Sequence, residues 1–355
     1  MDKTLFSRFL QIKKKSGVSF VDTHVHPIDV LGLAHHYEPS TNDGYSKRIQ
    51  NPTISLLEHL KFNDFALFIL RFVFKFLPFY ATSSVRDSYS NSSERELLNR
   101  LNSSGIDKAV LIPIEPLVSQ DQISQSFKNE KFIKLGSIDL DKTSLGGIEE
   151  EMDRQIREFN IVGLKLHPNF QSFYPIPEMN ERKLSEKLTQ LYSVINKKKL
   201  YVLFHAGLSY VPGPKKSFIK KDFALLENFC KDDVSILDLL KVPVVIAHMG
   251  VYNVSSADVA TQTKMLQKYN HLYFDTTAVN SDLIAKFIKT NGSQAIDRLV
   301  FGSDALYFDI KNSLLLVLLA LGATLPVSEF ETSVVKIFGS NYLDMLKRCQ
   351  SSSLL

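Results

Sequence analysis

The sequence contains few cysteines, little excess charge of either sign, and no hydrophobic run long enough to cross a membrane. Its 355 residues include two cysteines, Cys230 and Cys349, which lie far apart and outside any CxxC spacing. They therefore cannot form a thiolate metal cluster. Such sparse use of cysteine fits a reducing compartment, and we expect a cytoplasmic protein.

The balance of charge excludes another class of function. The 42 basic and 38 acidic residues give a formal net charge of +4. The short basic runs at 13–15 and 197–199 are typical of solvated helix ends rather than of a nucleic-acid footprint. We expect a small-molecule substrate and no nucleic-acid partner, with homo-oligomer formation left open.

Two segments could be mistaken for targeting or membrane elements. Charges and a glutamine interrupt the first 15 residues, which predicts an amphipathic helix rather than a secretory signal. The stretch FALFILRFVFKFLPFY at 65–80 is shorter than the roughly 20 residues that span a bilayer, and Arg71 and Lys75 interrupt it. It predicts a helix buried against the protein or folded over an active site; attachment to a membrane surface is the less favoured alternative.

Strand-like and helix-like segments alternate regularly along the chain. Ser93-x-x-Glu96 predicts the start of a helix that Gly105 ends. The eight strand-like segments, mostly continuous apolar runs, are 18–26, 107–113, 131–139, 161–168, 200–207, 242–250, 271–278 and 297–305. Continuous apolar runs are typical of strands buried on both faces.

Eight strand–helix units predict an α/β fold, a (β/α)8 TIM barrel formed as a single domain over residues 1–355. A doubly wound open sheet is the alternative, but no glycine-rich phosphate loop follows the first strand. The connection after that strand is much longer than the others. We expect residues 31–92 to form a long helical insert that leaves the active-site face of the barrel and serves as a lid.

Histidine, aspartate and lysine residues recur where the predicted strands end. Because these ends converge on one mouth of a barrel, the side chains should lie close together. They are His24 and His26 on the first strand, Lys165 and His167 on the fourth, His205 on the fifth, His248 on the sixth, Asp275 on the seventh and Asp304 on the eighth. Five imidazoles crowded with carboxylates would pack poorly without a cation. Imidazole and carboxylate ligands suit Zn2+, with Mn2+ or Fe2+ as alternatives.

Five short motifs resemble those of a known family. VDTHVHP, GLKLHP, FHAG, IAHMG and FGSDA occur in this order between residues 20 and 305. They resemble the amidohydrolase superfamily, most closely its amidohydrolase-2 (amidohydrolase-related) branch of metal-dependent hydrolases and decarboxylases. The resemblance implies metal ligation by His24, His26, His205 and Asp304, and proton acceptance by Asp304 in hydrolytic members. His248 would be a ligand in a two-metal site or a catalytic histidine in a one-metal site.

Lys165 separates the one-metal from the two-metal interpretation. GLKLHP resembles a segment of dihydroorotase, whose lysine is carboxylated and bridges two metals. Lys165 would otherwise be an ammonium that binds a substrate carboxylate, and we favour this one-metal interpretation. His167 and Asp275 would hold ligands in position or contact the substrate.

The resemblance implies an enzyme, a metal-dependent hydrolase. It would use a divalent-metal-activated water on an amide, ester or ring C–N or C–O bond of a small molecule. A metal-dependent non-oxidative decarboxylase of a small carboxylic acid is the first alternative, because the family shares one ligand set between both reactions. A non-catalytic metal-binding barrel is the second alternative.

Overall fold

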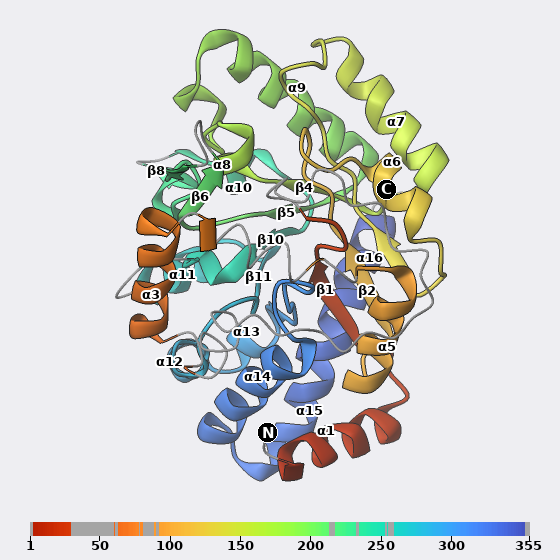
Figure 1. Cartoon of the computed structure of the whole chain (residues 1–355), viewed down its shortest axis with the longest axis vertical. Coiled ribbons are helices and arrows are strands. Elements are labelled where there is room, and N and C mark those ends of the chain that lie inside the picture. The colour runs from red at the N-terminus through yellow and green to blue at the C-terminus, as the bar shows by residue number, and fades with distance from the viewer. Residues whose placement is uncertain are drawn as a thin grey trace.

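Eight parallel strands form the centre of the molecule (Figure 1). The computed structural model describes residues 3–29, 60, 63–77, 79–80, 89, 92–212, 217–231, 234–252, 254 and 259–351. The strands are β1 (Val21–Val25), β2 (Lys108–Leu111), β3 (Phe132–Lys134), β4 (Gly163–Leu166), β5 (Tyr201–Phe204), β10 (Val244–Ile246), β11 (Leu272–Asp275) and β12 (Leu299–Val300). They pair in the orders β1-β2-β3 and β12-β11-β10-β5-β4.

Two bridges join these sheets into a closed barrel. Gly136, just after β3, bridges Leu164 of β4 in parallel. Val25 of β1 bridges Ala305, which follows β12, also in parallel. Each strand therefore has a neighbour on both sides, and the predicted TIM barrel is confirmed.

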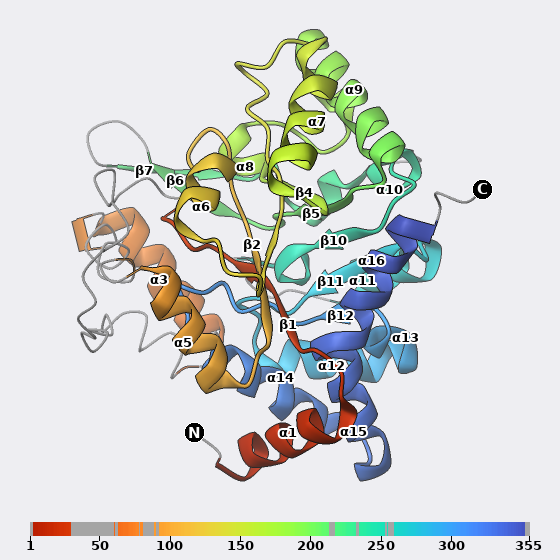
Figure 2. The ribbon, with the colours of Figure 1, turned by 90° about the vertical axis from the view of Figure 1, so that its right-hand side faces the viewer.

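Helices surround the barrel and follow its strands (Figure 2). The longer ones are α1 (Lys3–Ser16), α3 (Asp64–Phe76), α5 (Glu94–Ser104), α6 (Gln120–Ser126), α7 (Gly147–Phe159), α9 (Arg182–Lys198), α11 (Ala260–Lys268), α12 (Ser281–Asn291), α14 (Ile310–Thr324), α15 (Val327–Val335) and α16 (Asn341–Ser351). Shorter pieces are α8 (Pro168–Gln171), α10 (Ile236–Leu239), α13 (Ser293–Ile296), η1 (Pro177–Met179), η3 (Leu226–Asn228), η4 (Ala247–Gly250) and the π-helical turn η5 (Lys336–Ser340). Two hairpins follow β5: β6 (Ser209–Pro212) with β7 (Phe218–Lys221), and β8 (Cys230–Lys231) with β9 (Val234–Ser235).

The ends of α5 show why the sequence predicted this helix correctly. The Ser93 side chain accepts a hydrogen bond from the Glu96 amide at 3.1 Å and caps the first turn. Gly105 follows the last turn with φ 78°, in the left-handed region that glycine adopts without steric cost.

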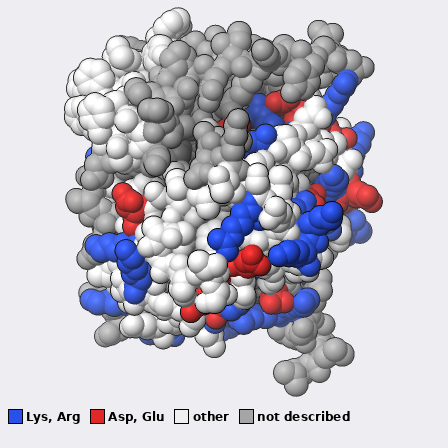
Figure 3. All heavy atoms as spheres, turned by 90° about the horizontal axis from the view of Figure 1, so that it is seen from below, with Lys and Arg blue, Asp and Glu red and all other residues white. Residues whose placement is uncertain are grey.

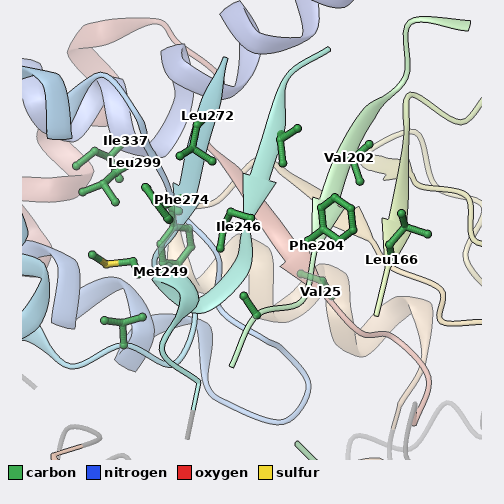
Figure 4. Packing of buried hydrophobic residues seen from close by; sticks show 14 of the residues in the cluster. Val25, Leu166, Val202, Phe204, Ile246, Met249, Leu272, Phe274, Leu299 and Ile337 are labelled. Atoms are coloured by element: carbon green, nitrogen blue, oxygen red, sulfur yellow. The ribbon is translucent and has the colours of Figure 1, made fainter. Parts of the chain in front are cut away.

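Alternate residues of the strands belong to two separate apolar clusters. Val202 and Phe204 of β5 lie in the large cluster under the helices, part of which Figure 4 shows. Tyr201 and Leu203 lie in a second cluster, against which α16 packs through Tyr342. Because successive side chains of a strand point to opposite faces, both faces of β5 are buried. This accounts for the continuous apolar runs in the sequence.

Helix α3 only partly matches the prediction of a buried helix at 65–80. Ala66 and Leu70 pack with Phe308 and Leu316 in a small cluster beside the barrel. Its opposite face, however, carries exposed phenylalanines. Residues 31–59 and most of 81–91 of the predicted lid lie outside the described residues. Among the helices that the structure describes, none is long and apolar enough to cross a membrane.

Basic and acidic side chains form pairs on the surface, which accords with the small net charge. Figure 3 shows the face seen from below, where basic and acidic side chains lie side by side. At this end of the molecule Lys13 pairs with Asp107 at 2.6 Å, and Lys336 pairs with Asp297 at 2.6 Å. Such pairing leaves no large patch of one sign on the described part of this face.

Candidate metal centre

Strand β1 places two imidazoles on one face of the barrel. His24 and His26 are two residues apart, so their side chains point the same way, and both are buried. The His24 Nδ1 lies 2.7 Å from Oδ2 of Asp275, and the His26 Nδ1 lies 3.3 Å from the Ile112 carbonyl oxygen. These acceptors assign the ring proton to Nδ1 in both histidines. Their Nε2 lone pairs then face each other at 3.2 Å.

Asp304 brings a carboxylate to the same point. Its Oδ1 lies 3.7 Å from the His26 Nε2 and 4.0 Å from the His24 Nε2. The Asp304 amide donates to the His24 carbonyl at 2.9 Å, which fixes the residue in the left-handed region at φ 61°. Burial raises the pKa of Asp304 to about 7, although the charge of Lys165 opposes this. A cation between these groups would lower that pKa and keep the carboxylate charged.

His205 and His248 form the second half of the histidine cluster. The His248 Nε2 lies 3.2 Å from the His205 Nδ1, while the His248 Nδ1 donates to the Thr277 carbonyl at 3.1 Å. His248 lies within η4 at φ 55°, a left-handed conformation that turns its ring toward His24, with the ring centroids 5.2 Å apart. The two histidine pairs are therefore neighbours in one mouth.

Asp275 holds both halves of this cluster. Its Oδ2 accepts from His24, and its Oδ1 accepts from the amides of His248 at 2.7 Å and Thr277 at 3.1 Å. The side chain is fully buried. Since both carboxylate oxygens are occupied, the geometry favours the positioning role over substrate contact.

Lys165 lies inside the same mouth. It is 1% exposed, and its Nζ has no hydrogen-bond partner among the described residues. Burial lowers the pKa of Lys165 to about 8, while the charges of Asp275 and Asp304 act in the opposite direction. A buried ammonium without a partner is costly, so this atom is suited to an anion or to conversion into a carboxylated form.

His167 lies next to the cluster but faces its own helix. Its ring stacks on His205 with centroids 3.9 Å apart, and its Nδ1 accepts from the Phe170 amide at 3.3 Å. The residue thus caps α8 and supports the His205 ring, whose Nε2 contacts Ser209 Oγ at 2.9 Å.

The motifs did not indicate several further residues around the mouth. Asp22 accepts from Ser303 Oγ and joins β1 to the segment that carries Asp304, and burial raises its pKa to about 7. Tyr252 lies with its ring 4.5 Å from that of His248. Tyr89 donates to the His26 carbonyl at 3.1 Å. Asp22 is part of VDTHVHP and could have been noticed there, whereas no pattern marks Tyr89.

The protonation states suit a metal ion. Burial lowers the pKa of His24, His26 and His205 well below the ordinary histidine value, and that of His248 to about 3. The imidazoles are therefore neutral near pH 7, which is the form that binds a metal. His24, His26 and Asp304 offer ligand atoms within 4.8 Å of one another. The Nε2 lone pairs of His24 and His26 and the Asp304 carboxylate would repel one another, whereas all three can bind a divalent cation.

Comparison with a family model identifies the protein family to which this barrel belongs. The model described as amidohydrolase matches residues 21–328. The chain belongs to the amidohydrolase family. The match includes His24, His205 and Asp304 and extends over most of the chain, so the resemblance inferred from the five motifs is confirmed.

Solved structures similar to this chain share its fold. An uncharacterised TIM-barrel protein from Bordetella bronchiseptica has a TM-score of 0.56 at 16% identity, covering 94% of this chain and 100% of that one. A 2,6-dihydroxybenzoate decarboxylase from Rhizobium has a TM-score of 0.53 at 12% identity, covering 93% of this chain and 99% of that one. A variant of 5-carboxyvanillate decarboxylase from Novosphingobium aromaticivorans, with bound manganese, has a TM-score of 0.50 at 13% identity, covering 94% of this chain and 98% of that one. No protein with a curated description matches this sequence.

Proposed function

We propose that this amidohydrolase is a metal-dependent hydrolase of a small molecule that carries an amide, an ester or a ring C–N or C–O bond. The observation that carries the proposal is the position of Asp304, a buried carboxylate beside the facing Nε2 atoms of His24 and His26. These three residues would hold the ion, and His205, whose Nδ1 lies 3.2 Å from the His248 Nε2, would be the fourth ligand. Zn2+ suits such ligands, and the manganese in the 5-carboxyvanillate decarboxylase supports Mn2+ as the alternative.

The chain supplies the proton acceptor and the substrate contacts. A divalent cation, when bound, makes a water more acidic and polarises a carbonyl. Asp304 would accept the proton of the attacking water at its carboxylate, which the hydrogen bond from its amide to His24 holds in place. The His248 Nδ1 is fixed on Thr277 and its Nε2 lies 3.2 Å from the His205 Nδ1, so His248 would offer Nε2 to the substrate when His205 holds the ion. The Lys165 ammonium would bind a substrate carboxylate.

Decarboxylation of a small carboxylic acid is the second candidate, and Lys165 is the observation that favours it. A buried cation without a partner among the described residues is what a decarboxylase needs to hold the carboxylate that it removes. The similar folds of 2,6-dihydroxybenzoate and 5-carboxyvanillate decarboxylases support this candidate as well. Both candidates predict a carboxylate-bearing ligand at Lys165.

Two parallel assays on one preparation distinguish the candidates. The chain, loaded with Zn2+ or Mn2+, is offered aryl esters, anilides and lactones in a pH-stat, and 2,6-dihydroxybenzoate and 5-carboxyvanillate in an assay of carbon dioxide release. Acid release supports hydrolysis, and carbon dioxide release supports the second candidate. A preparation that contains metal but turns over nothing in either assay would favour a non-catalytic barrel.

Asp304→Asn tests the assigned proton acceptor. An amide cannot take the proton of water, so turnover should fall at least about 100-fold. Asp238→Asn is the matched control, because Asp238 lies on α10 and contacts Tyr269 outside the mouth. Retention of full activity in Asp304→Asn, at unchanged metal content, would contradict the assignment.

A further inference from the structure

Helix α3 has two apolar faces, and within the described part of the chain one of them packs on the protein while the other is exposed. Ala66, Leu70 and Val73 are buried at 9% exposure or less, and this face meets Phe308 and Leu316. Their spacing of four and three residues places them on one side of the helix. The packed face therefore determines which side of α3 points away from the barrel.

The outward face of α3 carries a row of phenylalanines. Phe65, Phe68, Phe72 and Phe76 follow one another at helical spacing and are 46–60% exposed. Phe72 and Phe76 contact each other, with ring centroids 5.0 Å apart. Phe79, just beyond the helix, is 78% exposed. A contiguous row of aromatic side chains on the surface of a globular protein marks an interaction site.

Lysines accompany this apolar row. Lys75 is exposed on α3 and lies over the Phe76 ring, with Nζ 5.0 Å from the centroid. Figures 1 and 2 both place the β6–β7 hairpin on the same side of the molecule as α3. That hairpin presents the exposed residues Ile219 and Lys220. Ile219 and Lys220 are successive residues of β7, so their side chains point to opposite faces of the hairpin, and a surface that meets the hairpin at its edge would contact both.

These elements belong to the mouth of the barrel. Tyr307, which follows Asp304 closely in the chain, packs against the α3 cluster. On the other side, β6 begins at Ser209, whose hydroxyl contacts His205. A surface that covers the outward face of α3 and the β6–β7 hairpin would therefore lie beside the opening to the metal centre.

We propose that the outward face of α3 and the β6–β7 hairpin dock on a lipid bilayer that contains anionic headgroups. Exposed aromatic residues that enter the interface, with lysines beside them that meet lipid phosphates, are typical of a helix lying in the membrane plane. A second copy of the chain suits this face less well, because a two-fold contact would set the face and its lysines against an identical face of the same charge. The membrane-surface alternative for residues 65–80 is thereby favoured over complete burial.

Co-sedimentation of the full chain with vesicles tests the proposal. We expect binding to phosphatidylcholine vesicles that contain about 30% phosphatidylserine, weaker binding to pure phosphatidylcholine, and weakening of the former by salt. The triple variant Phe65→Ser, Phe68→Ser, Phe72→Ser should bind at least about tenfold more weakly. Val327→Ser, which removes a 74% exposed apolar side chain on α15, is the control and should bind like the parent.

A charge variant tests the lysines separately. Lys75→Glu with Lys220→Glu should abolish the preference for phosphatidylserine, at about fivefold per lysine. Lys14→Glu, on an exposed position of α1 at the far end of the molecule, should have no such effect. Because the replaced side chains are exposed, all variants should keep the parent's circular dichroism and melting temperature.

Three outcomes would overturn the proposal. The parent binds neither type of vesicle, or the phenylalanine variant binds as well as the parent. In the third, sedimentation equilibrium shows a dimer that the same variant dissociates, without vesicle binding, which would assign the face to a second copy. Vesicle binding requires neither turnover nor metal, so this result is independent of the proposed reaction.

Discussion

Asp275 shows how a single residue connects the two pairs of histidines. One of its oxygens assigns the proton of the His24 ring to Nδ1, and the other accepts the amide of His248. A carboxylate that accepts from the far nitrogen of a ligating histidine fixes the ring orientation and its tautomer. Asp275 would therefore act on a bound metal ion through its neighbours.

Asp275→Asn should lower metal affinity about 10–100-fold. The new amide keeps the acceptor for His248 only by presenting its NH2 group to the His24 Nδ1, and this disfavours the tautomer that frees Nε2. Competition with a fluorescent chelator measures the affinity, with Asp238→Asn as the control. An affinity equal to that of the parent would show that Asp275 does not orient His24.

Lys165→Met distinguishes the two roles considered for Lys165, an ammonium that binds a substrate carboxylate and a carboxylated bridge between two metals. The metal-free variant should melt at or above the parent's temperature, because a buried ammonium without a hydrogen-bond partner among the described residues is replaced by an apolar side chain of similar length. Turnover should be lost at an unchanged content of one ion per chain. A fall from two ions to one by elemental mass spectrometry would instead identify Lys165 as a carboxylated bridge between two metals.

Among the elements, α5 depends on the glycine that follows its last residue. Gly105 has φ 78°, and a Cβ there would lie 2.6 Å from Leu10 Cδ2 of α1. The glycine thus serves both the end of α5 and the close approach of α1.

Gly105→Ala should destabilise the protein by about 1–2 kcal/mol, since it combines a left-handed conformation with a steric overlap. Gly146→Ala is the control, because Gly146 has φ −69° and no atom within 4 Å of an added Cβ. The shift of the urea midpoint measures both changes. Equal midpoints for the two variants would contradict the role given to Gly105.

For the whole molecule, the candidate metal centre coincides with the seam where the barrel closes. His24 lies on β1 and His26 directly follows it, while Asp304 follows β12, the strand on the other side of the seam. An ion held by all three would connect the two ends of the barrel sheet. Binding of the native state alone then adds its free energy to stability.

Saturation with Zn2+ at 100 times its dissociation constant should stabilise the native state by about 2.7 kcal/mol. Removal of the ion with a chelator should accordingly lower the melting temperature by several degrees. His26→Ala removes a ligand, so its melting temperature should not respond to the chelator. An identical response in parent and variant would place the ion elsewhere.

The sequence by itself determined the barrel, the family and the residues that could hold a metal. Hydrophobic periodicity is local, so eight buried strands could be recognised one at a time, and the helix at 94–104 was bounded by its own Ser93 and Gly105. The order of five short motifs identified the amidohydrolase family. Residues at the ends of parallel strands could be grouped because barrel geometry brings those ends together.

Only the tertiary structure decided what these residues do to one another. That Asp275 has both oxygens occupied, that Lys165 lacks a partner among the described residues, and that Tyr89 reaches His26 all depend on contacts between distant segments. The same holds for α3, which has apolar side chains on both sides of the stripe that carries Arg71 and Lys75. The sequence of α3 could not show which face would pack. That face is determined by contacts with Phe308 and Leu316, more than two hundred residues further along the chain.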